Sequence, residues 1–173
     1  MKKVWLFVIC YLLFVLFVEV RAVDLKATEA LIQSSNYLSS AWKERLIISL
    51  KNAYDQGFPA SEAQMIISKS LTNKIAPGTI NGFMGLALEA YRQQLSLEPI
   101  LNKIKEGLAK GVAGERIQRV ATEVTTQLRA GKEMVEQVVQ KGVKVSDLRE
   151  KEGLIAAITL AQARGMNLKD LQQ

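Results

Sequence analysis

The sequence predicts an all-α protein, a compact bundle or short irregular array of about seven to eight amphipathic helices behind an N-terminal signal peptide. Three observations support this fold class. Apolar residues recur with the 3.6-residue period of a helix, and no segment alternates apolar and polar residues over a useful length. A helix-closing pattern also recurs, in which an apolar helix end is followed by Gly, an apolar residue and then a new amphipathic helix.

The closing pattern has a simple physical origin. A Gly just past a helix end adopts the left-handed conformation at little cost because it has no Cβ, and the chain reopens as a helix a few residues later. The pattern occurs in AYDQGFPASEA (53–63), GLAKGVAGERI (107–117), VVQKGVKVSDL (138–148) and LAQARGMNLKDL (160–171).

The spacing of these turns bears on whether they mark repeats. Gly57, Gly111, Gly142 and Gly165 hold the turn position, and Gln94 occupies the equivalent place in AYRQQLSLEPI. The successive intervals of 37, 17, 31 and 23 residues are irregular, whereas a solenoid repeats at a fixed period. This irregularity favours reuse of one cap by unrelated helices over divergent repeats, and both interpretations stay open.

The first half of the chain is expected to hold four helices, with Pro77-Gly78 as the clearest break between them. Their expected ranges are 25–38, 41–56, 61–75 and 79–94.

In the second half, Ser96 is a favourable N-cap for the next helix. Glu98 and Pro99 then fall in its first turn, where the missing N–H of proline costs little. A further apolar stripe runs from Ile117 to Leu128 after Gly114.

Two more helices are expected towards the C-terminus. Gly131 is expected to separate the preceding helix from a shorter one over 134–140. Ser146-Asp147 is expected to cap the last long helix, which runs to about Arg164 before a short final turn of helix.

Residues 1–22 are typical of a secretory signal peptide. Two lysines precede the uncharged run of 15 residues Val4–Val18, and Val20-Arg21-Ala22 forms a cleavage site with small residues. As a helix the run spans about 22 Å, short of the roughly 30 Å hydrocarbon core of a membrane. Cleavage before Val23 is therefore favoured over an uncleaved anchor, and the single Cys10 is an apolar filler of the signal.

Residues 23–173 are expected to form one domain without a recognisable catalytic centre. The chain has no His, and its one Cys lies in the signal, which excludes a Ser-His-Asp triad, a thiol nucleophile and a Cys/His zinc site from this domain. We expect no cofactor or metal and no enzymatic activity. A carboxylate-based glycan hydrolase is the weakest alternative, with Glu133 and Glu136 on one helix face.

Two groups of residues are candidate surfaces. The first is a basic patch for a partner or an anionic surface, against the simpler interpretation of solvated helix faces. The second is an aromatic face, against the simpler interpretation of core residues. The basic group comprises Lys103, Lys105, Lys110, Arg116 and Arg119, and the aromatic group comprises Trp42, Tyr54 and Phe58.

The favoured function is that of an exported, non-enzymatic binding or adaptor protein of the bacterial cell envelope, periplasmic or secreted. Its expected partner is another envelope protein or a helical peptide, and no nucleic acid is expected because the basic region lacks aromatic residues to stack on bases. The alternative is a membrane-surface protein, held by an uncleaved N-terminus facing the periplasm or by the basic patch.

Overall fold

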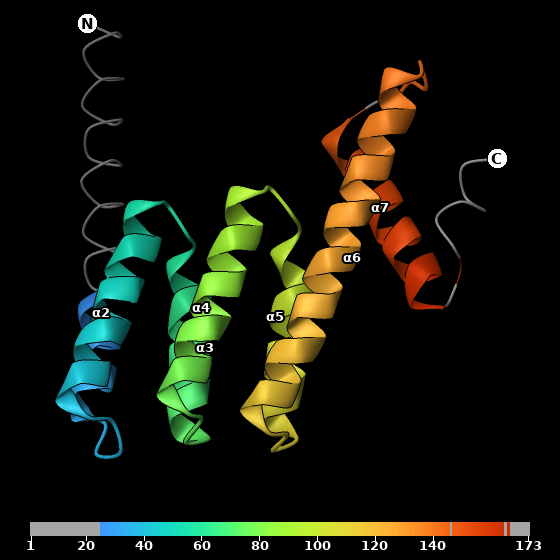
Figure 1. Ribbon diagram of the computed structural model, residues 1–173. Helices are drawn as coiled ribbons and strands as arrows, with labels where there is room; N and C mark the ends of the chain where they lie inside the picture. The colour runs from blue at the N-terminus through green and yellow to red at the C-terminus, as the bar shows by residue number, and fades with distance from the viewer. Residues whose placement is uncertain (1–24, 146, 165, 167–173) are drawn as a thin grey trace, which may run out of the picture. The chain divides into compact units, whose positions relative to one another are not determined.

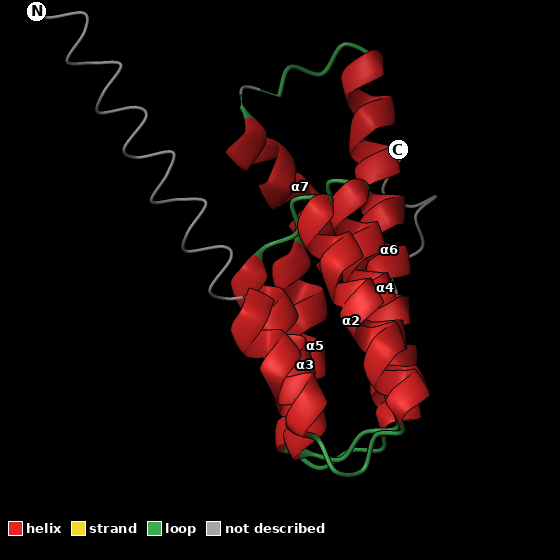
Figure 2. Cartoon of the chain, turned by 90° about the vertical axis from the view of Figure 1, so that its left-hand side faces the viewer, coloured by secondary structure: helices red, strands yellow, loops and turns green. Residues whose placement is uncertain are grey.

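The computed structural model describes residues 25–145, 147–164 and 166. These residues form helices joined by short turns, and none of them is in a strand (Figure 2). The all-α prediction is confirmed for this part of the chain. The predicted signal peptide, the Ser146 cap residue and the Gly165 turn lie outside the described residues.

A helical stretch over 25–34 precedes the helices labelled in Figure 1. These are α2 (Ser40–Asp55), α3 (Ala60–Thr72), α4 (Pro77–Arg92), α5 (Leu97–Ala109), α6 (Gly114–Gln140) and α7 (Leu148–Ala163).

The helix bounds repeat along the chain with a period of 37 residues. The helices α2 and α4 start 37 residues apart and end 37 residues apart, and the same interval relates both ends of α3 to those of α5. The helix α6 also starts 37 residues after α4. The interpretation that unrelated helices reuse one cap was therefore wrong for residues 40–114, which form repeated helix pairs.

One turn of this period, after α3, is closed by Lys74 rather than by a glycine, so the spacing of the glycines did not indicate it. Lys74 and Gln94 have φ of 51° and 55°, in the same left-handed region as Gly57 and Gly111 at 77° and 64°. These four closing residues are therefore spaced by 17, 20 and 17 residues.

Each closing turn satisfies helix carbonyls in the same way. After α3, the Lys74 N–H donates to the Leu71 carbonyl at 3.0 Å, and the Ile75 N–H donates to the Ser70 carbonyl at 3.0 Å. After α5, the Gly111 and Val112 N–H groups donate to the carbonyls three and five residues earlier, at 3.2 and 3.0 Å. This is the Schellman arrangement, which stabilises a helix end through its own carbonyl groups.

Three local predictions need correction. Pro77 starts α4 rather than separating two helices, because proline fits the first helical position, and the break lies before it at 73–76. Ser96 is the N-cap of α5 as expected, but its side chain makes no capping hydrogen bond. Gly131 does not end a helix, because α6 continues through it to Gln140.

The described residues fall into two compact units, one up to Met84 and one from Gly85, and each is described separately. The prediction of a single domain over 23–173 stays a prediction. The first unit is centred on residues including Leu46, Leu50, Phe58, Ile67, Ile80 and Phe83, all at most 3% exposed.

In the second unit, α5 packs on α6 and α6 packs on α7 (Figure 1). Among the buried aliphatic residues of this unit are Ile100, Ile104 and Leu108 of α5. Among the described residues, no helix has both the length and the apolar character needed to cross a membrane.

Candidate functional site

The structure gathers part of the predicted basic patch around one carboxylate. The Glu106 carboxylate of α5 pairs with the ammonium of Lys110, the C-cap residue of this helix, at 2.6 Å. It also pairs with the Lys103 ammonium of α5 at 3.3 Å. The hydrogen bonds from Lys110 and then Lys103 hold the pKa of Glu106 below its usual value. Two of the five predicted cations are thus already paired with a carboxylate of α5.

The other predicted cations lie on different faces. Lys105 follows Lys103 by two residues, which places it about 200° around α5, and it is half-buried. Arg116 and Arg119 are exposed near the start of α6. A single patch made of all five residues stays a prediction, and the grouping that the structure gives is Lys103 with Lys110.

The predicted aromatic face is reduced by burial. Phe58 is only 3% exposed and belongs to the core of the first unit. Trp42 and Tyr54 are half-buried. The guanidinium carbon of Arg45 lies 5.1 Å from the centroid of the Trp42 ring, a cation–π contact that further covers the indole.

The first candidate site is a groove of about 750 Å³ in the second unit, lined by the start of α5, the middle of α6 and α7. Its apolar lining comes from Val124 and Leu128 of α6 and from Ile155 and Leu160 of α7. Polar and charged side chains around it include Glu98 and Glu152. We call this the α5–α6–α7 groove.

The α7 wall of this groove has unusual composition for a solvent-facing helix. The 11 residues 153–163 carry no charge, yet Leu154 and Leu160 are 39% and 53% exposed. Small residues allow α7 to approach α6, since a Cβ added at Gly131 would lie 3.2 Å from the Ile155 carbonyl oxygen. The sequence shows that residues 153–163 are uncharged, whereas only the structure shows that part of this run is exposed.

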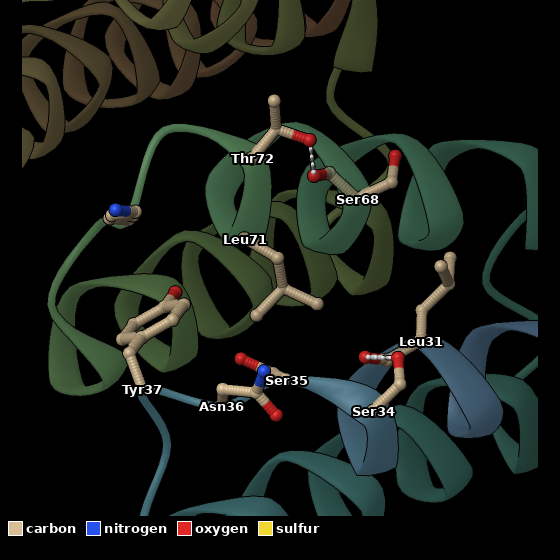
Figure 3. A pocket seen from close by; sticks show the side chains of 9 residues that line it. Leu31, Ser34, Ser35, Asn36, Tyr37, Ser68, Leu71 and Thr72 are labelled. Carbon is tan, nitrogen blue, oxygen red and sulfur yellow. Dashed lines mark hydrogen bonds between the residues drawn. The ribbon is translucent and has the colours of Figure 1, made fainter.

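A second cavity of about 540 Å³ lies in the first unit (Figure 3). Its walls come from residues 31–37 and from 68–74, at the end of α3 and its closing turn. Six of its nine lining residues have polar, uncharged side chains, although most of the lining surface is apolar. The Tyr37 hydroxyl donates to the Ile75 carbonyl at 3.1 Å, and partial burial raises the pKa of this tyrosine. We call this the Tyr37 pocket, and the sequence analysis did not identify it.

No protein-family model, curated protein or solved structure matches the chain. Among the described residues, no three metal-ligating side chains gather in one place.

Proposed function

We propose that this chain is an exported, non-enzymatic α-helical binding protein of the bacterial cell envelope, and that a helical segment of its partner docks in the α5–α6–α7 groove. The observation that carries the proposal is the groove itself. Its volume of about 750 Å³ lies in the range of protein binding sites, and it combines an apolar lining with polar edges. Grooves of this character bind the apolar face of an amphipathic helix.

The exposure of α7 supports the same function. Leu160 lines the groove and is 53% exposed, which leaves apolar surface in water that a partner helix would cover. Leu160 adjoins the other apolar residues of the groove, and contiguous apolar surface with a polar rim is typical of interaction sites.

The membrane-surface alternative receives less support. Lys103 and Lys110 share the Glu106 carboxylate, so the region around the α5 turn presents less net positive charge than five free cations would.

Neighbouring positions on α7 provide a matched experiment. Ala156 lines the groove, whereas the next residue, Ala157, is exposed and does not. A photo-crosslinking amino acid is placed at either position of the full chain in the native cell. We expect one envelope protein to crosslink from position 156 and not from 157.

A pair of leucine variants gives the second control. Leu160→Glu places a charge in the groove, whereas Leu154→Glu places one on the same helix outside it. We expect Leu160→Glu to abolish the crosslink from position 156 and Leu154→Glu to preserve it. Equal crosslinking from both alanines, crosslinking to lipid alone, or no crosslink would contradict the proposal. Sequencing the processed N-terminus tests export separately, with Val23 expected as the first residue.

A further inference from the structure

The Tyr37 pocket presents hydroxyl oxygens whose hydrogen atoms are already engaged. The Ser34 hydroxyl donates to the Leu31 carbonyl at 3.0 Å, and the Thr72 hydroxyl donates to the Ser68 carbonyl at 2.9 Å (Figure 3). The Tyr37 hydroxyl donates to a backbone carbonyl in the same way. A hydroxyl has one hydrogen but two lone pairs, so these three side chains can only accept further hydrogen bonds.

The remaining lining adds three donors and an apolar wall. The Ser35 hydroxyl, the Asn36 amide and the Lys74 ammonium can donate hydrogen bonds. Leu71 lies in the centre of the view in Figure 3, between Tyr37 on one side and Leu31 on the other. Tyr37 is partly exposed, with 39% of its surface accessible to solvent. A ligand here meets several acceptors, a few donors and an apolar patch.

This combination selects against ions. No carboxylate lines the pocket, so a hard divalent cation lacks its preferred charged ligands. An anion would meet one cation, Lys74, together with three oxygen atoms that have no hydrogen left to donate.

We propose that the Tyr37 pocket binds a short neutral saccharide. Sugar hydroxyls donate to the three engaged oxygens and accept from Asn36 and Lys74, while the C–H face of a ring packs on Tyr37 and Leu71. The cavity of about 540 Å³ is of a size that holds a small ligand. This binding site is independent of the α5–α6–α7 groove and does not rest on the function proposed for it.

The test is a titration of the full-length gene product, purified as exporting cells process it, with N,N′-diacetylchitobiose. We expect saturable binding by NMR, with shifts of the Tyr37 ring and of the Asn36 side-chain amide. Asn36 is exposed and Asn36→Ala removes one donor, so affinity should fall about three- to tenfold. The matched control is Asn73→Ala, an exposed asparagine close in sequence that does not line the pocket.

A second variant keeps the test independent of a single hydrogen bond. Ser34 is exposed and lines the pocket, so Ser34→Trp should fill it and abolish binding while the helical circular dichroism is retained. Absence of saturable chitobiose binding would overturn the proposal, and so would equal losses in Asn36→Ala and Asn73→Ala. Displacement of the shifts by inorganic phosphate at equal concentration would identify an anion site instead.

Discussion

The helices α3 and α5 have the same length and occupy equivalent places in the 37-residue period, but their sequences solve the packing differently. Each has 13 residues and ends in a left-handed closing residue. Position 70 of α3 is serine where position 107 of α5 is glycine, and Lys74 closes α3 where Gly111 closes α5. One backbone pattern therefore tolerates different side chains at its helix contacts and at its closing turns.

The difference is largest where α5 meets α6. A Cβ added at Gly107 would lie 2.5 Å from Cγ1 of Ile117, so α6 occupies the space that a side chain would need. At the equivalent position of α3, Ser70 is fully buried with its Cβ and hydroxyl in place. Glycine at 107 thus reflects close helix packing, whereas the closing turns depend on hydrogen bonds that several residues allow.

The largest expected change in stability comes from adding a side chain at the close contact of Gly107 with Ile117. We expect Gly107→Ala to lower the free energy of unfolding by about 1–3 kcal/mol, because Ile117 is buried and must shift. Urea unfolding followed by circular dichroism measures the change. Gly85→Ala in α4 is the control, since nothing lies within 4 Å of the added Cβ, and it should stabilise by roughly 0.5–1 kcal/mol. A Gly107→Ala protein at least as stable as the parent would refute the close contact.

The equivalent serine should respond in the opposite direction. The buried Ser70 hydroxyl oxygen has no hydrogen-bond partner among the described residues. Replacing it by Ala removes the desolvation penalty and keeps the Cβ, so Ser70→Ala should raise the free energy of unfolding by about 1–2 kcal/mol. The same urea titration measures it, with the exposed Ser61→Ala as a control near zero. Destabilisation by Ser70→Ala would show that the hydroxyl contributes a bond.

The closing residues give the next comparison. A residue with a Cβ is strained in the left-handed region, so Gly111→Ala should cost about 1 kcal/mol. Lys74→Gly should gain roughly 0.5 kcal/mol, because relief of strain exceeds the added flexibility of the unfolded chain. Thermal unfolding of both variants checks the opposite signs. The same sign for both would mean that side-chain contacts at Lys74 outweigh its backbone conformation.

Much of the helical pattern could be predicted from the sequence. The apolar stripe and Pro99 placed α5 correctly, because they report one helix and its first turn. The turn at Lys74 was not predicted, because lysine is not a residue typical of helix ends in the left-handed conformation. Backbone hydrogen bonds and the burial of Ile75 stabilise this turn instead. The helix end predicted at Gly131 was wrong because a glycine inside a helix can allow close packing of a neighbouring helix instead of ending the helix.

The candidate sites were less predictable. The groove and the Tyr37 pocket each join segments distant in sequence, and periodicity tells which face of a helix is buried but not against which neighbour. The basic patch was predicted by counting cations. The ion pair between Glu106 and Lys110 could also have been predicted, since a spacing of four residues brings opposite charges together on a helix.

That pairing gives the smallest expected effect, and it is a further difference between the two helices, because α3 has Lys69 where α5 has Glu106. Its carboxylate is fully exposed, so we expect little change in overall stability from Glu106→Gln. We expect the pKa of Glu106, followed by NMR of its carboxyl carbon, to lie below its ordinary value. A pKa lowered by folding means that the stabilisation is present above the unfolded pKa and is lost as the pH falls through the folded one.

Single lysine variants separate the two partners of Glu106. Lys110→Ala should raise the titration midpoint of Glu106 more than Lys103→Ala, since the hydrogen bond from Lys110 is the larger cause of the lowered pKa. Lys105→Ala is the matched control on another face of α5 and should leave the midpoint almost unchanged. Added salt should raise the midpoint in the parent and have less effect in Lys110→Ala, because exposed ion pairs are screened. An equal shift of the midpoint in all three lysine variants would contradict specific pairing of Glu106 with Lys110 and Lys103. It would indicate instead that the positive charges around the α5 turn act together, as the basic-patch prediction supposes.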